Sequence, residues 1–226
     1  MSVASQYQTD TAPLNMDLSE RVVANTANHP WLESPSKKVF RKPLERESLE
    51  SGRTTSIVRF APGSYFPEHS HPLGEEIFVL EGVFSDENGD YPAGSYLRNP
   101  PNSRHSPFSK QGCTLFVKLD HFDADDSESV RIQTESAQWQ PGQGNLKVLP
   151  LHSFKGEHTA LVWWPAGEVF QPHIHMGGEE ILVLSGEFAD EQGVYPKGTW
   201  LRNPHQSRHH PFVEQETLIL VKVGHL

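Results

Sequence analysis

Two similar stretches decide the fold: EEIFVLEGVFSDENGDYPAGSYLRNPPNSRHSPF at residues 75–108 and EEILVLSGEFADEQGVYPKGTWLRNPHQSRHHPF at residues 179–212. They are the central part of a longer repeat, in which residues 66–118 align with residues 170–222 without a gap and with 29 identities in 53 positions. A constant offset of this kind indicates a duplicated structural unit. The 226 residues are therefore interpreted as two small related domains rather than one domain of average size.

Each repeat has the spacing of apolar residues that is typical of strands. Short runs rich in β-branched, aromatic and aliphatic residues lie at 54–60, 77–80 and 113–119 in the first repeat and at 159–164, 181–184 and 218–223 in the second. Asp, Asn, Gly and Pro gather at 86–94 and 190–198, where they favour tight turns. No stretch keeps an apolar period of 3.6 residues, so we predict an all-β protein in which each repeat forms a β-sandwich or barrel.

The chain divides into four predicted segments. We expect an N-terminal arm at residues 1–30, a first domain at 31–121, an acidic linker at 122–138 and a second domain at 139–226. The arm is polar and is expected either to be flexible or to lie against the other domain. The linker is acidic and polar apart from a short strand-like run at 130–133, and a regulatory acidic tract is the less favoured interpretation.

Composition and charge exclude several classes of function. The chain has 19 Lys and Arg against 29 Asp and Glu, a net charge of −10, so its surface repels phosphate backbones and no nucleic-acid partner is expected. Cys113 is the single cysteine, which rules out an intramolecular disulfide and a zinc finger. No secretory signal is visible, and no apolar run approaches the ~20 residues of a membrane span. We therefore expect a cytoplasmic protein with no membrane partner.

Histidine is the unusual residue, with 13 in the chain, and the repeated histidines fall in two matching strings. The first string reads H-x-H-x3-E and is followed by a third histidine 30 residues after the glutamate, and the second has the same spacing. In a strand, residues i and i+2 face the same side, so H-x-H places two imidazoles together and a carboxylate beyond a chain reversal can approach them. Three nitrogens and one carboxylate suit a divalent zinc, iron, nickel, manganese or copper ion. The predicted metal ligands are His69, His71, Glu75, His105, His173, His175, Glu179 and His209.

Two alternatives accompany this prediction. Polar residues on a wet strand face would explain a lone H-x-H, but not the recurrence of four ligand-type residues at identical spacing while their neighbours differ. Glu76 and Glu180 are rival carboxylates, and they would serve if the turn were one residue longer; the spacing to the following glycine favours Glu75 and Glu179. Three further residues are expected to take no part in the centres: His205 and His210 at the surface, and the small buried Cys113.

Other positions differ between the repeats although the predicted ligands do not. We expect these residues to line ligand pockets, so that the first pocket is more polar, the second is more aromatic, and at most one centre is the working one. The predicted pocket residues are Arg59, Phe78, Tyr96, Trp163, Leu182 and Trp200. Two arginine pairs that the repeats share either orient an anionic ligand or form surface ion pairs: Arg98 with Arg202, and Arg104 with Arg208.

The paired strings resemble the two motifs of the cupin family, with Asn102 and Gln206 where those motifs carry a glycine. More narrowly, HSHPLGEEIFVLEGVFSDENGDYPAGSYLRNPPNSRHSP is similar to the cupin domain of the ChrR anti-sigma factors. The resemblance covers roughly residues 50–120 and 150–226. It implies two tandem jelly-roll cupins with the metal, zinc first, held inside each barrel mouth by the eight predicted ligands.

The same resemblance bears on partners. ChrR proteins also carry an N-terminal helical domain that holds the sigma factor through a zinc site of His and Cys. The first 50 residues of this chain have no cysteine and no helical pattern, so we do not expect them to bind a sigma factor by the mechanism of that family. The duplication instead lets the two halves pair within one chain as an intramolecular pseudo-dimer of cupins.

Three functions remain open for such a bicupin. The first is a metal-binding protein that senses or binds a small molecule or responds to oxidative stress. The second is a dioxygenase-type metalloenzyme, in which the metal binds O2 or activates a small organic substrate. The third is a structural module whose metals brace the barrels. We favour the first over the second, and both over the third.

Overall fold

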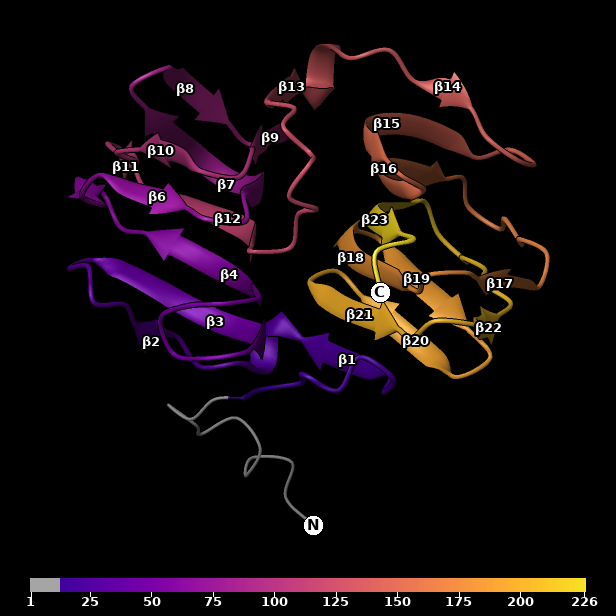
Figure 1. The fold of residues 1–226 in the computed structure, drawn as a ribbon. Helices are drawn as coiled ribbons and strands as arrows, with labels where there is room; N and C mark the ends of the chain where they lie inside the picture. The colour runs from indigo at the N-terminus through magenta and orange to yellow at the C-terminus, as the bar shows by residue number, and fades with distance from the viewer. Residues whose placement is uncertain (1–12) are drawn as a thin grey trace. The chain divides into compact units, whose positions relative to one another are not determined.

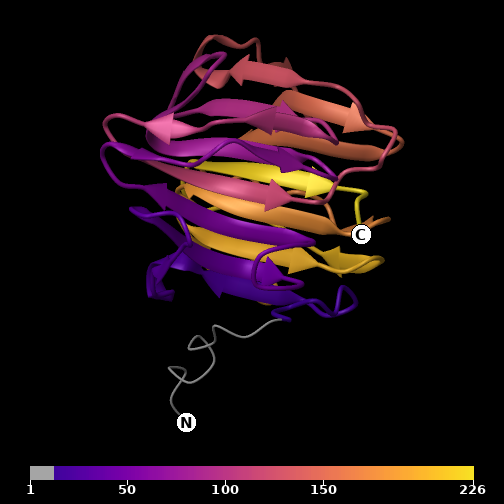
Figure 2. The same cartoon turned by 60° about the vertical axis from the view of Figure 1, so that its left-hand side comes forward.

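The computed structural model describes residues 13–226, so the first 12 residues of the predicted arm lie outside the described part of the chain. The described residues form two compact units (Figure 1), and Figure 2 shows their strands from another side. Unit 1 contains residues 13–16 and 29–136, and unit 2 contains residues 17–28 and 137–226. Both consist of strands, turns and a short 3-10 helix, and no helix of residues 13–226 is long and apolar enough to cross a membrane. The prediction of an all-β fold is confirmed.

Unit 1 is built on one large antiparallel sheet, with the strand order β13-β9-β7-β12-β4-β3-β2. The long β7 continues beyond this sheet and pairs there with β8 and β11, while β6 pairs separately with β10. The elements of unit 1 are β2 (Leu32–Glu33), β3 (Val39–Arg46), β4 (Thr54–Phe60), β5 (Ser64–Tyr65), β6 (His69–His71), β7 (Glu75–Asp86), β8 (Gly89–Pro92), β9 (Ser95–Asn99), β10 (Ser103–His105), β11 (Phe108–Ser109), β12 (Cys113–Leu119), β13 (Val130–Gln133) and the 3-10 helix η3 (Thr134–Ser136).

Unit 2 repeats this architecture with the strand order β1-β21-β18-β23-β16-β15-β14. The pairs β17-β22 and β19-β20 correspond to β6-β10 and β7-β8 of unit 1. The elements of unit 2 are β1 (Val22–Asn25), the 3-10 helix η2 (Thr26–Asn28), β14 (Gln140–Pro141), β15 (Lys147–Phe154), β16 (Glu157–Trp164), β17 (His173–His175), β18 (Glu179–Ser185), β19 (Glu187–Asp190), β20 (Gly193–Pro196), β21 (Thr199–Asn203), β22 (Ser207–His209) and β23 (Thr217–Val223).

Alternating residues of the main sheets form the two cores. In β7, Ile77 and Val79 are no more than 1% exposed, and they pack in one cluster with Leu97 and Leu115. Because strand side chains alternate, apolar residues at every second position bury one face of the sheet. Burial of each such side chain contributes about 2 kcal/mol to folding. The corresponding cluster of unit 2 includes Ile181, Val183, Leu201 and Ile219.

Each main sheet ends on a strand from the start of the other repeat. The strand β1 precedes the first repeat but pairs with β21 in unit 2, with Val22 opposite Arg202 (Figure 1). The strand β13 precedes the second repeat but pairs with β9 in unit 1, with Val130 opposite Arg98. The segment predicted as a linker is therefore part of unit 1 up to residue 136, because β13 covers the hydrogen-bonding groups of a sheet edge.

Gly82 and Gly186 close the repeated carboxylate motif where a side chain does not fit. Both have a φ of 73°, in the left-handed region. A Cβ atom on Gly82 would lie 2.1 Å from the carbonyl oxygen of Gly112, and one on Gly186 would lie 2.2 Å from that of Glu216. Glycine lets the chain bend and the neighbouring backbone approach closely. This explains the fixed spacing between the predicted carboxylate ligand and the glycine that follows it.

Candidate metal centres

Two short paired strands assemble the histidines of each candidate centre. In unit 1, His69 and His71 face the same side of β6, and β10 pairs with β6 so that His105 lies opposite His69. The ring centroids of these three imidazoles are 4.7 to 4.9 Å apart. In unit 2, β17 and β22 pair in the same register, with His173 opposite His209. The H-x-H spacing and the pairing of a second short strand thus bring three imidazoles together in each unit.

A buried carboxylate joins the histidines of unit 1. The strand β7 begins at Glu75, directly after the chain reverses at Gly74. The Oε2 atom of Glu75 lies 3.4 Å from Nε2 of His71 and 3.4 Å from Nε2 of His105. These two Nε2 atoms are themselves 3.0 Å apart. Four candidate ligand residues therefore surround one point in the interior of unit 1.

The arrangement recurs in unit 2 with nearly the same dimensions. The Oε2 atom of Glu179 lies 3.4 Å from Nε2 of His175 and 3.6 Å from Nε2 of His209. The two Nε2 atoms are 2.9 Å apart. In each unit, one nitrogen from each of the three histidines lies within 4.8 Å of the others. The eight residues predicted as ligands thus form two clusters of four.

The rival carboxylates point away from the histidines. Glu76 follows Glu75 in β7 and therefore projects from the opposite face, where its carboxylate accepts a hydrogen bond of 2.9 Å from the Tyr96 hydroxyl. In unit 2, Glu180 accepts a hydrogen bond of 3.2 Å from the Trp200 indole N–H. Strand alternation thus places the first carboxylate of each pair, and not the second, beside the imidazoles.

Hydrogen bonds to the surrounding chain orient the candidate ligands. The Nδ1 atom of His69 lies 2.8 Å from the carbonyl oxygen of Pro67, which can only accept, so Nδ1 carries the proton and Nε2 keeps its lone pair. His173 is held in the same way by the Gln171 carbonyl at 3.0 Å. The Asn99 amide donates a hydrogen bond of 2.8 Å to Glu75 Oε2. Such outer contacts fix the orientation of metal-binding side chains.

Burial controls the protonation of the inner histidines. It lowers the pKa of His71 below its ordinary value and is the main cause that lowers the pKa of His175 to about 3. Burial is the largest single influence on His105 and opposes its charged form, but the carboxylates of Asp86, Glu75 and Glu87 together outweigh it, and the pKa of His105 is raised. His71 and His175 are therefore neutral at pH 7, which is the state in which an imidazole binds a metal.

The donor set of each cluster fits a divalent metal ion. Three imidazole nitrogens and one carboxylate oxygen converge, and in unit 1 the Nε2 atoms of His71 and His105 are 3.0 Å apart beside the anionic oxygen of Glu75. Zinc, iron, manganese, nickel and copper all accept such nitrogen and oxygen donors. A bound ion of this kind supplies a Lewis acid and, for the redox-active metals, an electron donor or acceptor.

The residues predicted to line ligand pockets do not lie with the histidines. Phe78 alternates with the core residues Ile77 and Val79, so it faces the other side of the main sheet, and Tyr96 lies opposite Phe78 in the neighbouring strand. Leu182 and Trp200 pair in the same way in unit 2. The physical reason is the two-residue period of the strand, which directs these side chains away from the barrel interior.

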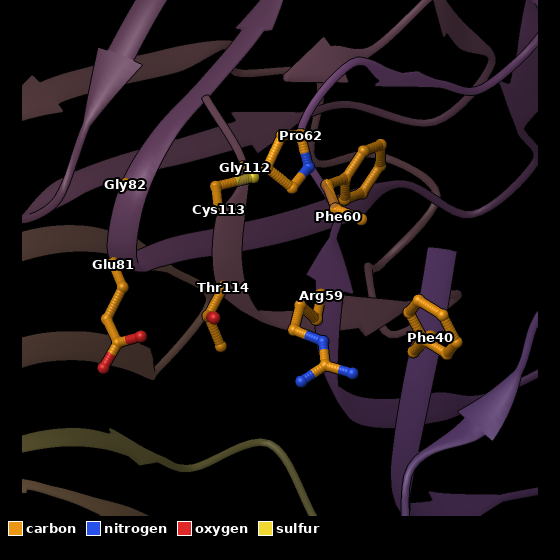
Figure 3. Close-up of a pocket in the computed structure, with 10 residues that line it drawn as sticks. Phe40, Arg59, Phe60, Pro62, Glu81, Gly82, Gly112, Cys113 and Thr114 are labelled. Carbon is orange, nitrogen blue, oxygen red and sulfur yellow. The ribbon is translucent and has the colours of Figure 1, made fainter. Parts of the chain in front are cut away.

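Arg59 lies in a separate groove of about 490 Å³ in unit 1. Its guanidinium stacks on the ring of Trp31 at 4.3 Å and on that of Phe40 at 4.9 Å. Figure 3 shows Arg59, Thr114 and Glu81 projecting to the same side of the sheet. The side chains that line this groove include none of the candidate ligands. In unit 2 the matching Trp163 is covered by the Lys147 ammonium at 4.7 Å.

The shared arginines divide into buried and exposed pairs. Arg98 is fully buried and bonded to the carboxylates of Glu76 and Asp126, and its counterpart Arg202 is also fully buried. The prediction of an anion-orienting residue or a surface ion pair is therefore wrong for Arg98, because its partners are buried carboxylates of its own unit. Arg104 on β10 and Arg208 on β22 are exposed. His205 and His210, which flank β22, are also exposed, as predicted. Cys113 is buried, as predicted.

Aromatic rings beside the histidines are the feature that sequence reasoning missed. The ring of Phe66 lies 4.9 Å from that of His69, and the ring of Phe84 lies 6.2 Å from that of His105. In unit 2, Phe170 and Phe188 take the same places. These phenylalanines are identical in the two repeats, so a search among differing positions passes over them. Identity at these matched positions is the sequence signal that could have found them.

The fold and the two clusters together define a class: a duplicated cupin with three histidines and one carboxylate gathered in each barrel. The sequence model of the ChrR cupin-like domain matches the chain twice, at residues 19–123 and 127–226, and the chain belongs to this family. The prediction of two ChrR-type cupin domains in tandem is confirmed. A search of curated protein sequences finds no match.

Several solved structures share this fold over most of the chain. A proposed dioxygenase from Nostoc punctiforme is 15% identical with a TM-score of 0.77, and the match covers 91% of this chain and 82% of that one. Salicylate 1,2-dioxygenase from Pseudoaminobacter salicylatoxidans, solved with gentisate, is 12% identical with a TM-score of 0.66, over 92% and 81% of the two chains. Oxalate decarboxylase from Lactobacillus farciminis is 14% identical with a TM-score of 0.64, over 90% and 86%. At these identities the similarity establishes the fold alone.

Proposed function

We propose that this protein is a metal-binding bicupin that holds one divalent metal ion in each cupin and uses it to bind a small organic molecule or to respond to an oxidant. The observation that carries the proposal is the convergence, in both units, of three imidazoles and one buried carboxylate. The proposed ligands are His69, His71, Glu75 and His105 in unit 1, and His173, His175, Glu179 and His209 in unit 2. Zinc is the first metal to test, on the resemblance to the ChrR cupins.

The walls beside the clusters support the binding of a small molecule. Phe66 and Phe84 place aromatic rings beside His69 and His105, so the surroundings of the first cluster are apolar on that side. An apolar wall next to a few fixed polar groups is the usual composition of a small-molecule site. It also excludes water, which strengthens polar contacts with the ion. We infer that an organic molecule with an oxygen donor is the preferred ligand.

A second candidate function is a dioxygenase-type oxidoreductase acting on a small organic substrate. It is supported by the similarity in fold to salicylate 1,2-dioxygenase over 92% of the chain, and by a donor set that suits iron as well as zinc. In either function the protein's own contribution is the same. The histidines and the glutamate hold the ion, Asn99 orients Glu75, and Phe66 and Phe84 exclude water from one side.

Metal analysis of the purified protein tests the proposed centres. We expect two equivalents of metal per chain in protein purified without added metal, one equivalent in His69→Ala or His173→Ala, and close to none in the double variant. His210→Ala is the matched control, because His210 is exposed and adjoins a proposed ligand, and it retains two equivalents. An unchanged metal content in the double variant would refute the assignment.

An oxygen-uptake assay separates the two candidate functions. The metal-loaded protein is incubated with a panel of small organic acids that includes gentisate, salicylate and oxalate, and dissolved oxygen is recorded. Binding seen by calorimetry without oxygen uptake supports the binding or sensing function. Uptake that requires an iron-loaded protein and is lost in His69→Ala plus His173→Ala supports the dioxygenase. If the protein holds its metal tightly but binds none of the compounds and takes up no oxygen, a structural role of the metals is the better explanation.

A further inference from the structure

An arginine next to the first cluster reaches it from the leading segment of the second repeat. Arg131 lies on β13, the strand that precedes the second repeat and completes the sheet of unit 1. Its Nη2 atom donates a hydrogen bond to Oδ1 of Asn99, and its Nε atom donates one of 3.4 Å to the hydroxyl of Tyr91. Its Nη1 atom also donates bonds of 2.8 Å to the carbonyl oxygens of Arg98 and Val130. The guanidinium is therefore fixed in place by several acceptors.

The second cluster has an arginine that makes the equivalent contacts. Arg21 lies directly before β1, the strand that precedes the first repeat and completes the sheet of unit 2. Its Nε atom donates a hydrogen bond of 2.9 Å to Oδ1 of Asn203, and its Nη2 atom donates one of 2.7 Å to the hydroxyl of Tyr195. The same Nη2 atom lies 3.3 Å from Oδ2 of Asp190. Asn203 and Tyr195 are the repeat counterparts of Asn99 and Tyr91.

Each arginine stands behind two of the proposed ligands. In unit 1, Asn99 donates its amide N–H to Glu75, while the Tyr91 hydroxyl donates a hydrogen bond of 3.1 Å to Asp86. The other oxygen of Asp86 lies 3.8 Å from Nδ1 of His105. In unit 2 the corresponding distances are 3.0 Å for the amide, 2.7 Å for the hydroxyl and 3.7 Å for the imidazole. One guanidinium thus connects, through two intermediates, to the carboxylate and to one histidine of each cluster.

The guanidinium group determines which atoms donate and which accept along this chain of hydrogen bonds. A guanidinium only donates hydrogen bonds, so the amide of Asn99 must turn its oxygen toward Arg131 and its N–H toward Glu75. The hydroxyl of Tyr91 likewise accepts from Arg131 and directs its own hydrogen to Asp86. An asparagine or tyrosine without such a partner is free to adopt the other orientation. The arginine therefore holds both groups in the orientation that the proposed ligands need.

The two arginines occupy different positions in the leading strands. Val22 and Val130 pair with the equivalent residues Arg202 and Arg98, so β1 and β13 have the same register on their sheets. Arg21 comes one residue before that register position, and Arg131 comes one residue after its own. Each reaches the same two acceptor types from a different point of the backbone. What the two units share is a guanidinium group bonded to the asparagine and the tyrosine. The arginines that supply it do not occupy equivalent sequence positions.

We propose that Arg131 and Arg21 are positioning residues for the metal centres of unit 1 and unit 2, so that each centre is completed by the leading segment of the other repeat. This inference rests on the proposed metal-binding function. Loss of an outer contact of this kind weakens metal binding by about 10- to 100-fold. We therefore expect Arg131→Ala to weaken the centre of unit 1 alone, and Arg21→Ala to weaken the centre of unit 2 alone.

The test uses the full chain with one centre disabled at a time. In the His173→Ala background only the centre of unit 1 binds metal, and zinc affinity is measured by competition with a chelator. There Arg131→Ala lowers the affinity about 10- to 100-fold and alters the visible spectrum of bound cobalt, whereas Arg21→Ala leaves both unchanged. In the His69→Ala background the two arginine variants exchange their effects. The exposed Lys110→Ala and Lys197→Ala control for the loss of one positive charge.

Two further measurements separate positioning from a general structural role. If Arg131 acts through Asn99, the effect of Arg131→Ala on affinity shrinks in an Asn99→Ala background, and Arg131→Lys recovers only part of it, because an ammonium group lacks the planar fork that reaches two acceptors. The lysine variant also serves if the alanine variant fails to fold. The inference would be overturned if one arginine variant lowered the zinc affinity of both centres equally and lowered the unfolding temperature as well. It would also be overturned if the arginine variants left the zinc affinities unchanged. An unaltered protein that takes up no metal would instead refute the proposed function, and this inference with it.

Discussion

Gln206 and Asn102 occupy the turn position at which the cupin motif carries a glycine. Their φ angles are 64° and 67°, in the left-handed region. Asparagine tolerates this region better than glutamine, because its short side chain can bond to the local backbone. The backbone N–H of Gln206 donates a hydrogen bond of 2.9 Å to the carbonyl oxygen of His175, so this turn supports a strand that bears proposed ligands. The departure from the motif changes the side chain and keeps the backbone conformation.

We expect Gln206→Gly to raise the free energy of unfolding by about 0.5 to 1 kcal/mol, because glycine adopts a positive φ without steric cost. Asn102→Gly is the matched control and should change the stability less. Urea unfolding followed by tryptophan fluorescence measures both. A loss of stability in Gln206→Gly, or an equal gain in the two variants, would contradict the argument from backbone strain.

The thiol of Cys113 should react slowly in the folded protein. Burial raises its pKa from an ordinary value of 9.0 to about 11, and the thiolate is the reactive form. At pH 8 the folded thiol therefore carries about 100-fold less thiolate than the unfolded one. We expect alkylation by iodoacetamide to be correspondingly slow in the native protein, to accelerate in guanidinium chloride, and to rise with pH toward 11.

The same shift has a defined sign for stability. Because the unfolded thiol ionises at a lower pH than the folded one, the ionisation of Cys113 favours the unfolded state once the pH exceeds about 9. The stability contribution is thus complete below that pH and is lost as the pH rises toward the folded pKa. Equal alkylation rates for native and denatured protein at pH 8 would show that Cys113 is accessible and that its thiol has an ordinary pKa.

At the scale of elements, the short edge strands β1 and β13 matter for both main sheets. The four residues of β1 complete the sheet of unit 2, and the four residues of β13 complete that of unit 1. Each strand has one side that is more buried than the other, which in β1 is the side of Ala24, 2% exposed and opposite Trp200. Each also carries or follows the arginine that stands behind a proposed metal centre. In each unit, the short strand that completes the main sheet therefore also positions the arginine beside the proposed metal centre.

We expect Ala24→Asp to lower the free energy of unfolding by about 3 kcal/mol, because it places a carboxylate at a buried position of β1. It should also weaken metal binding at the centre of unit 2 by about 10- to 100-fold, since displacement of β1 removes Arg21 from unit 2. Val23→Asp is the matched control in the same strand, because Val23 is 42% exposed, and its effect should stay within about 0.5 kcal/mol. Differential scanning calorimetry and metal analysis check both effects. Similar losses in the two variants would contradict the assigned faces of β1.

At the scale of the whole molecule, both units should depend on metal for part of their stability. A ligand that binds only the folded state stabilises it by about 2.7 kcal/mol at a free concentration of 100 times its Kd. We expect removal of metal by a chelator to lower the unfolding temperature and addition of zinc to restore it. The zinc-dependent gain should become smaller in His69→Ala or His173→Ala and vanish in the double variant. An unfolding temperature that does not respond to metal in the unaltered protein would argue against occupied centres.

The pocket prediction illustrates where sequence reasoning stopped. Arg59 and Trp163 differ between the repeats and drew attention for that reason, yet they lie one residue away from Phe60 and Trp164, which belong to the core clusters. A shift of one residue in a strand moves a side chain to the opposite face of the sheet. The register that decides the face comes from pairing with distant strands, and the sequence of one strand does not contain it.

The amino-acid sequence by itself determined the duplication, the all-β class, and the residue types and spacing of the two candidate metal centres. These features depend on local alternation and on the fixed distance between a histidine pair, a turn and a carboxylate, all of which are read along one chain segment. Only the tertiary structure decided that β1 and β13 close the sheets, and that Arg21 and Arg131 stand behind the clusters. The partner of an edge strand is chosen by long-range hydrogen bonding and packing, which short polar segments such as residues 17–28 do not reveal locally.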